Sequence, residues 1–169
     1  MWLKVVKMNL YGFEVKVVFL VNANIVLAYA WHYDEKRALN HLNKIKKFHN
    51  LKGYVKKSNK LEAWLKKKIE ETVIDGMEFD LPEFNYKNKL VYENIIKISK
   101  GKTATYAQIA KKSKVKYTEL LATLMKNPFQ VLIPCHRLLT NKGTLFGFYP
   151  LGKEVKRKLL ELEGVRLKR

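Results

Sequence analysis

The sequence contains a single cysteine among its 169 residues, Cys135. One thiol excludes an internal disulfide framework and a structural zinc site built on several cysteines. Three of the four histidines (His32, His41 and His49) lack cysteine partners and the close helical spacing of a metal-binding pair, so we expect no metal. A chain without disulfides fits the reducing interior of a cell, and we expect a cytoplasmic location.

Acidic residues and long apolar runs are also scarce. No apolar stretch approaches the length of a membrane-spanning helix, and the N-terminus lacks the layout of a signal peptide, so we expect no membrane partner. Aspartate and glutamate number 15 against 34 lysines and arginines, which gives a net charge of +19. Such a charge attracts polyanions and favours a nucleic-acid partner. The alternative is a lysine-rich surface that only solvates an ordinary domain.

Internal repeats are absent, and the chain changes character near its middle. The runs "FEVKVVFLV" and "NIVLAYAWH" are β-branched and aromatic and are separated at Ala23, which predicts a hairpin. Apolar residues at helical spacing then predict two helices, within residues 34–50 and 61–73. Gly76 and Pro82 break the pattern in an acidic stretch, residues 75–85, which we interpret as a connection between two domains.

The second half of the chain predicts short helices. The stretch "TYAQIAKKS" opens with Thr105 and Gln108 at the spacing of a capping box, in which each side chain satisfies a free amide at a helix start. After a short break, "YTELLATLMKNP" predicts another helix that ends at Asn127 and Pro128. Two short helices joined by a tight turn are typical of a helix-turn-helix motif.

Together these patterns predict an α+β fold in two parts. Residues 1–80 are expected to form a small antiparallel sheet-plus-helix domain. Residues 81–169 are expected to form a mostly helical domain with the helix-turn-helix motif, which is a common way of binding DNA.

The outward face of the second helix of this motif is predicted to carry Thr118, Glu119, Ala122, Thr123 and Lys126. A helix that reads base edges in the major groove usually presents arginine, asparagine or glutamine. Small side chains instead permit a close approach of the backbone, which suits the minor groove or docking without sequence preference. The alternative is a solvent-facing helix with no role in DNA binding.

Cys135 lies between Pro134 and the pair His136–Arg137 in the stretch "LIPCHRLLT". Pro134 favours the start of a helical turn, whose free amides stabilise a thiolate, and Arg137 adds positive potential. Because adjacent side chains point in different directions, a direct pair of Cys135 and His136 is geometrically awkward. Two alternatives stay open: a buried cysteine that packs as a small apolar residue, and a cysteine hydrolase whose histidine comes from elsewhere.

The order of these motifs resembles that of a known family. "PCHR" preceded by "NP" and "TYAQIA", and followed by "GFYPLGKEVKRKLLELEG", resembles the O6-alkylguanine-DNA alkyltransferases (methylated-DNA–protein-cysteine methyltransferases). The resemblance extends from Tyr86 to Val165. The N-terminal half is similar only in kind, to the small ribonuclease-H-like domain of that family.

The resemblance implies a DNA repair methyltransferase that binds double-stranded DNA containing O6-alkylguanine. The damaged base is flipped out of the stack, and Cys135 takes the alkyl group in an irreversible, single-turnover transfer without a cofactor. A monomer acting at the nucleoid, or in the nucleus of a eukaryote, is expected. The alternative is a non-catalytic alkylguanine-DNA-binding protein of the same fold.

The resemblance also implies catalytic roles for five residues. Cys135 would exchange its proton with His136 through a water molecule, and Glu163 would orient the imidazole, as in a triad with water inserted. Asn127 would hold the turn before the active-site segment. Tyr106 would rotate the phosphate of the target nucleotide and assist protonation of the guanine.

Contacts to the DNA or the base are implied or expected at nine further positions: Tyr117, Thr118, Ala122, Thr123, Arg137, Leu138, Tyr149, Pro150 and Lys156. Two of these depart from the family pattern. Thr118 stands where the family carries an arginine that fills the gap left by the flipped base, and we hypothesise that Tyr117 or Lys116 takes that place. Pro150 lacks the backbone N–H that the family offers to the guanine O6.

Overall fold

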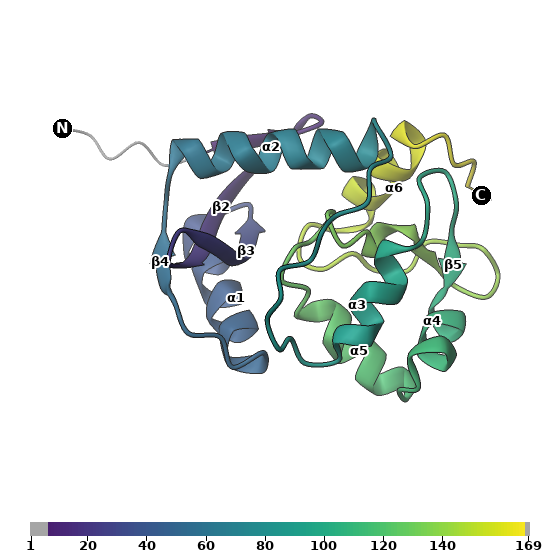
Figure 1. The fold of residues 1–169 in the computed structure, drawn as a ribbon. Coiled ribbons are helices and arrows are strands. Elements are labelled where there is room, and N and C mark those ends of the chain that lie inside the picture. The colour runs from purple at the N-terminus through teal and green to yellow at the C-terminus, as the bar shows by residue number, and fades with distance from the viewer. Residues whose placement is uncertain (1–6, 168–169) are drawn as a thin grey trace.

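The structure, a computed structural model, describes residues 7–167 and places an N-terminal antiparallel sheet beside a helical C-terminal half (Figure 1). The predicted α+β fold is confirmed. The strands of the sheet are β1 (Lys7–Leu10), β2 (Phe13–Asn22), β3 (Ile25–His32) and β4 (Tyr54–Lys56). β2 is central: it pairs with β3 along one edge, and with β1 and β4 along the other.

The predicted hairpin is the β2–β3 pair. Its turn residues Ala23 and Asn24 have φ angles of 48° and 66°, the left-handed values that a two-residue hairpin loop requires. Five successive residues of β2, Val17–Val21, are buried, so the strand is covered on both faces.

Two helices pack on this sheet, as the periodicity predicts. α1 (Glu35–Phe48) contacts β2 and β3, and α2 (Asn59–Val73) contacts β1. Asp34 and Ser58 cap them, because each side chain accepts a hydrogen bond from a first-turn amide. Residues 74–88, which include the predicted domain connection, form no helix or strand and lead across to the C-terminal half (Figure 1).

The C-terminal half contains the predicted helix-turn-helix motif, α4 (Tyr106–Ser113) and α5 (Tyr117–Met125). The capping box is present: the Gln108 amide donates to Thr105 Oγ1 at 3.1 Å, and the Thr105 amide donates to Gln108 Oε1 at 2.8 Å. The other elements are α3 (Lys89–Ile96), β5 (Ala104–Thr105), the 3-10 turn η1 (Cys135–Arg137), β6 (Leu138–Leu139) and α6 (Lys153–Leu162).

The two halves meet along the free edge of β3. The Tyr29 amide donates to the Pro128 carbonyl at 3.0 Å, and the Tyr86 hydroxyl donates to the Leu27 carbonyl at 2.6 Å. These bonds satisfy backbone groups that an exposed edge strand would leave unpaired. Among residues 7–167, no helix is long and apolar enough to cross a bilayer, and no cluster of side chains is suited to hold a metal ion.

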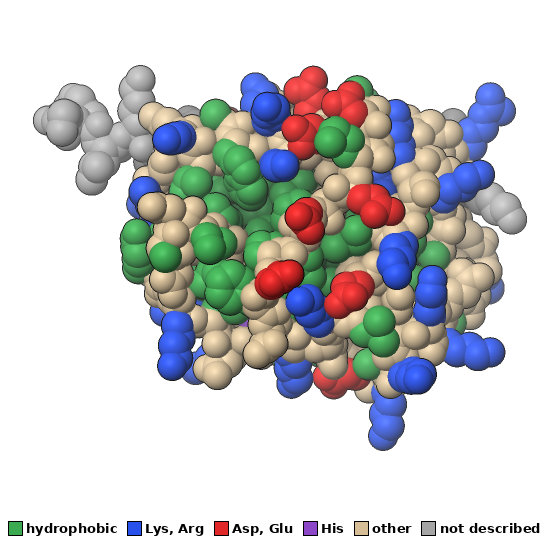
Figure 2. Space-filling model, viewed as in Figure 1, with side chains coloured by type: hydrophobic (Ala, Val, Ile, Leu, Met, Phe, Trp, Pro, Cys, Tyr) green, Lys and Arg blue, Asp and Glu red, His purple; other side chains and the backbone are tan. Residues whose placement is uncertain are grey.

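Acidic side chains gather on one part of the surface. Figure 2 shows them in the middle of this face, with lysine and arginine around the edges. Glu78, Asp80 and Glu83, all exposed, lie in the segment between α2 and α3.

Candidate active site

Cys135 lies on the wall of a cavity of about 220 Å³ between α4, α5 and the loop that precedes α6. Aromatic rings form one side of this cavity: Tyr106, Phe146, Phe148 and Tyr149. The apolar side chains of α5 and one polar residue complete it: Leu121, Leu124, Met125 and Gln130. The thiol is thus the one nucleophilic sulfur in a mostly apolar pocket that is open to solvent.

The Cys135 thiol is only 8% exposed, and its surroundings favour the protonated form. Burial raises its pKa, and this effect exceeds the opposing contributions of a hydrogen bond from Asn127 and the positive charge of Lys156. The predicted thiolate stabilised by free amides is therefore not the resting state at neutral pH. A nucleophile of this kind needs a base to take its proton.

Asn127 holds the thiol and the turn before it. Its Nδ2 donates to Cys135 Sγ at 3.4 Å and to the Ile133 carbonyl at 3.1 Å, while its Oδ1 accepts from the Phe129 amide at 2.9 Å. The amide is 3% exposed and is satisfied on both sides. The role of turn support that the sequence predicts for Asn127 agrees with these contacts.

His136 is fully buried and pairs with Glu163, the residue at the C-terminal end of α6. Its Nε2 lies 3.1 Å from Glu163 Oε1, so Nε2 carries the proton and Nδ1 is the acceptor. Nδ1 is buried and has no hydrogen-bond partner among the residues that the structure describes. Within residues 7–167 no hydrogen bond joins Cys135 directly to His136, as the divergence of adjacent side chains predicts.

Glu163 is kept ionised by two neighbours. Burial by itself would raise the pKa of this carboxyl, but hydrogen bonds from His136 and Arg137 outweigh it and leave the pKa below its usual value. Burial lowers the pKa of His136, and Glu163 opposes that shift only in part. The resting pair is therefore a neutral imidazole beside a carboxylate.

Arg137 is buried inside the protein, which corrects the contact with DNA predicted for it from the sequence. The side chain is 4% exposed, and its Nε donates to both oxygens of Glu163 at 3.0 and 3.1 Å. Its Nη1 donates to the Ile98 carbonyl at 2.6 Å, and its Nη2 to the Thr72 carbonyl at 3.2 Å. The guanidinium therefore supports Glu163 and ties α6 to the C-terminal end of α2.

Lys156 and Tyr106 form a second buried pair at the cavity. Lys156 is fully buried, and its Nζ donates to the Tyr106 hydroxyl at 2.7 Å. Burial lowers the pKa of Lys156 to about 8, and burial raises the pKa of Tyr106. Because the ammonium has only donors, it occupies a lone pair of the phenol and leaves the phenol hydrogen free to point elsewhere.

The three remaining predicted pocket residues differ in position. Tyr149 lines the cavity and is 42% exposed. Leu138 is fully buried in β6, and the structure does not place its side chain in the cavity wall. Pro150 follows Tyr149 through a cis peptide bond and also lies outside the lining.

The surface of α5 agrees with the prediction at its start and differs at its end. Tyr117 is 48% exposed, Thr118 is exposed and Ala122 is half-buried. Thr123 is fully buried: its hydroxyl donates to the Glu119 carbonyl at 2.7 Å and accepts from Asn88 Nδ2 at 2.8 Å. The predicted outward position of Thr123 is therefore wrong, because α3 and its N-cap cover that side of the helix.

Several cavity residues had no signal in the sequence. The apolar side chains of α5 divide between two places: Leu120 enters the core, while Leu121, Leu124 and Met125 line the cavity. Gln130 and Phe146 come from irregular segments with no periodicity. A pattern along one element does not reveal which partner that element will face.

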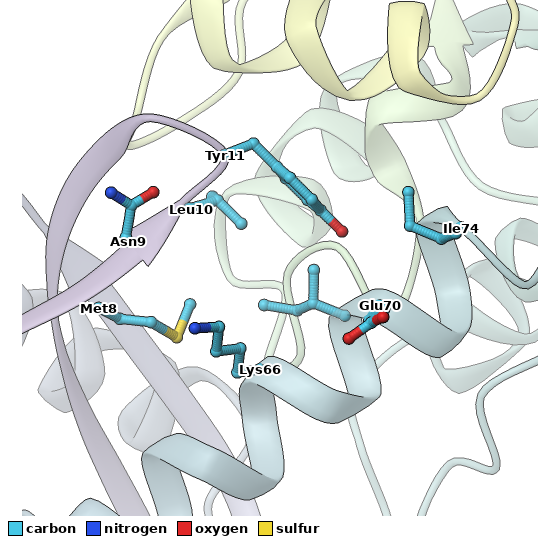
Figure 3. A pocket seen from close by; sticks show the side chains of 8 residues that line it. Met8, Asn9, Leu10, Tyr11, Lys66, Glu70 and Ile74 are labelled. Atoms are coloured by element: carbon cyan, nitrogen blue, oxygen red, sulfur yellow. The ribbon is translucent and has the colours of Figure 1, made fainter.

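A second cavity, of about 290 Å³, lies between the β1–β2 hairpin and α2 (Figure 3). Its polar groups are those of Asn9, Tyr11, Lys66 and Glu70, around an apolar floor. It contains neither a thiol nor an imidazole among its lining residues.

Exposed lysines surround the turn between α4 and α5. Lys111, Lys112, Lys114 and Lys116 all lie within the last turn of α4 or the residues that lead into α5. Ammonium groups placed in this way suit contacts with phosphates.

Comparison with known proteins finds sequence similarity in the C-terminal half of the chain. Residues 87–165 match the family model described as 6-O-methylguanine DNA methyltransferase, DNA binding domain. Over 77 residues the chain is 42% identical to a methylated-DNA–protein-cysteine methyltransferase of Saccharolobus islandicus, covering 46% of this chain and 50% of that protein. A protein of the same name from Sulfurisphaera tokodaii is 37% identical over 97 residues, covering 54% and 61%.

The fold as a whole also has a counterpart. The crystal structure of O6-methylguanine-DNA methyltransferase from the hyperthermophilic archaeon Pyrococcus kodakaraensis aligns with a TM-score of 0.71 over 95% of this chain and 98% of that one, at 20% identity. This likeness extends the shared fold to the N-terminal half. The chain spans about half the length of the first curated relatives it matches. Residues 87–165 of the chain are therefore similar in sequence to the DNA-binding domain of the 6-O-methylguanine DNA methyltransferase family.

Proposed function

We propose that this protein repairs O6-alkylguanine in double-stranded DNA by transferring the alkyl group to Cys135. The observation that carries the proposal is the placement of the thiol in an apolar cavity, beside the His136–Glu163 pair. The second imidazole nitrogen of His136 is an acceptor that has no partner in the described part of the chain. The match of residues 87–165 to the methyltransferase family supports the proposal.

The proton of the thiol leaves first. Nδ1 of His136 is the acceptor, and a water molecule carries the proton because the two side chains have no direct hydrogen bond. The imidazolium that forms is stabilised by the Glu163 carboxylate, which Arg137 keeps ionised. Sγ then attacks the alkyl carbon, and the bond between that carbon and O6 breaks.

The electron pair of the broken bond goes to the guanine, which takes up a proton. Tyr106 is the donor, because Lys156 occupies a lone pair of its oxygen and leaves its hydrogen free. The buried ammonium also stabilises negative charge on the phenol oxygen as the proton leaves. The products are a thioether on Cys135 and an unmodified guanine, so each molecule reacts once.

The helix-turn-helix motif supplies the DNA contact. Tyr117 and Thr118 are exposed at the start of α5, next to the lysines of the preceding turn. We place this end of α5 against the minor groove, with the protein bound as a monomer and with little sequence preference. Tyr117 or Lys116 fills the space that the flipped base leaves.

One experiment tests the proposal against its alternatives. The protein is incubated with duplex DNA containing O6-methylguanine, and the Cys135 peptide is weighed by mass spectrometry. The expected result is a gain of one methylene unit that is absent in Cys135→Ser. Tight binding without a mass gain would instead favour the non-catalytic binding protein. If the protein neither binds this DNA nor gains mass, both the alkyltransferase and the non-catalytic binding protein are excluded. Repeated turnover of an ester substrate would then indicate a cysteine hydrolase.

A further inference from the structure

The side chain of Gln130 connects the cavity wall to the N-terminal sheet. Gln130 is 5% exposed and lines the cavity beside Cys135. Its Oε1 accepts a hydrogen bond from Nε1 of Trp31 in β3, at 2.5 Å. Its Nε2 donates to the carbonyl of Tyr149, which also lines this cavity. One amide therefore joins a strand of the sheet to the loop that forms the rim.

The amide of Gln130 has a single orientation that satisfies both neighbours. The indole N–H of Trp31 can only donate, and the Tyr149 carbonyl can only accept. Turning the amide over would place two donors together and two acceptors together. Both hydrogen bonds are therefore made or lost as a unit, and Trp31 determines which way the Gln130 amide faces.

Trp31 is a rigid support, whereas the loop that it holds is not part of a helix or strand. Trp31 is 1% exposed and packs against the ring of Tyr29, with centroids 5.3 Å apart. Residues 140–152 contain no regular element, and Tyr149 is 42% exposed. The backbone carbonyl of Tyr149 accepts the bond from Gln130. The ring of Tyr149 packs in a T-shaped contact with the ring of His41 in α1, with centroids 4.9 Å apart.

We propose that Trp31 is a positioning residue for alkyl transfer: by orienting the Gln130 amide it fixes the Tyr149 backbone and thereby the shape of the cavity around Cys135. The inference rests on the proposed function, since it assigns to the N-terminal sheet a part in the same reaction. Burial raises the pKa of the Cys135 thiol, and Gln130 is the last and smallest of the neighbours that oppose this rise. A loosened amide therefore changes both the cavity wall and the thiol.

The test compares two substitutions on the same strand. Trp31→Phe removes the indole N–H, whereas Tyr29→Phe removes a hydroxyl that donates to the backbone carbonyl of Gln130 and leaves its side chain untouched. Each variant loses one buried hydrogen bond to the same residue. Single-turnover transfer from duplex O6-methylguanine DNA is measured at increasing DNA concentration, together with the thermal midpoint of unfolding.

Trp31→Phe is expected to lower the limiting rate constant about 10-fold, because a small misplacement of reacting groups has large effects on rate. The DNA concentration at half-saturation should stay within about twofold of the wild type. Tyr29→Phe should leave the limiting rate constant and the half-saturating DNA concentration within about twofold of the wild type. It should lower the thermal midpoint of unfolding by about as much as Trp31→Phe does. Equal slowing in the two variants would show that Trp31 acts through stability alone and would overturn the proposal.

A second substitution keeps the inference testable if Trp31→Phe does not fold. Gln130→Met is expected to slow transfer at least 10-fold as well, and this result is read without Trp31→Phe. Where Trp31→Phe does fold, adding it to Gln130→Met should cause no further loss, since the two residues act through one bond. Additive losses would contradict the proposal, as would a wild-type rate in Gln130→Met.

A measurement without DNA separates this inference from the proposed function. The rate at which iodoacetamide alkylates Cys135 is followed from pH 6 to 10 in the wild type and in the three variants. A changed pH profile in Trp31→Phe and Gln130→Met, but not in Tyr29→Phe, supports the link between Trp31 and the thiol even if the wild type transfers nothing from DNA. Identical profiles in all four proteins would overturn it.

Discussion

Burial changes the chemical role of individual residues at this site. Lys156 and Arg137 both carry positive charge in a strongly basic chain, yet neither is available to a phosphate, because each is buried and bonded inside the protein. Lys156 holds the Tyr106 hydroxyl, and Arg137 holds the Glu163 carboxylate. The two cations therefore act on the polar groups around Cys135 rather than on the charge of the DNA backbone.

Replacing Lys156 should separate stability from activity. Burial lowers its pKa from 10.5 to about 8, so the unfolded chain binds the proton more tightly between pH 8 and 10.5. The stability of the wild type relative to Lys156→Met should therefore rise with pH across that window. At pH 7 the variant should be at least as stable as the wild type, while alkyl transfer falls by about 10-fold or more. Calorimetry and single-turnover kinetics check the two parts; an unchanged transfer rate would contradict the role of Lys156.

Replacing Arg137 should affect folding rather than the electrostatics of DNA binding. Arg137→Met leaves Glu163 buried without its main partner, which should lower the free energy of unfolding by about 3 kcal/mol. The slope of log affinity against log salt should stay unchanged, because Arg137 meets no phosphate. Lys112→Ala, on the exposed end of α4, is the matched control and should reduce that slope by about 1. A reduced slope in Arg137→Met would show that Arg137 contacts a phosphate, as the sequence predicts, and would contradict this prediction.

At the scale of elements, α5 serves two surfaces at once. Its first turn presents Tyr117 to solvent, and its later residues Leu121, Leu124 and Met125 form a wall of the cavity. A single rigid helix thus connects the proposed DNA contact to the pocket that holds the thiol. The exposed aromatic ring at its start is the feature proposed to fill the gap that a flipped base leaves in the stack.

Tyr117→Ala should slow transfer from duplex DNA but not from single strands. The ring is proposed to occupy the gap in the stack, which exists only when the base is flipped from a duplex. A fall of about 10-fold in the duplex rate is expected, corresponding to about 1.4 kcal/mol. Thr118→Ala is the control at the neighbouring exposed position. If Tyr117→Ala and Lys116→Ala both retain the wild-type duplex rate, neither residue fills the gap.

At the scale of the whole molecule, the N-terminal half supports the C-terminal end of α5. His41 Nε2 of α1 lies 2.8 Å from the Met125 carbonyl, and His49 Nε2 lies 2.8 Å from the Lys126 carbonyl. The last carbonyls of a helix have no partner within it, so donors from another element are needed when that end is buried. The two histidines thereby connect the sheet domain to the helix-turn-helix motif.

This interface should weaken in acid. Burial lowers the pKa of His49 to about 4, so between pH 6.5 and 4 the unfolded chain binds a proton that the folded chain does not. Stability from this group is therefore lost as the pH falls through that window, by up to about 3 kcal/mol. In His49→Gln the loss between pH 6.5 and 4 should be smaller, as measured by urea denaturation. An equal pH dependence in both proteins would rule out His49 as the source.

The sequence by itself determined the features that depend on neighbours along the chain. The hairpin at Ala23, the capping box of Thr105 and Gln108, and the segment around Cys135 follow from local sterics and hydrogen bonding, which a short stretch contains in full. The tertiary structure alone decided the contacts between distant residues: Trp31 with Gln130 is 99 positions apart, and Lys156 with Tyr106 is 50. It also placed Arg137 and Thr123 inside, because burial depends on which elements pack together and not on the residues beside them in the chain.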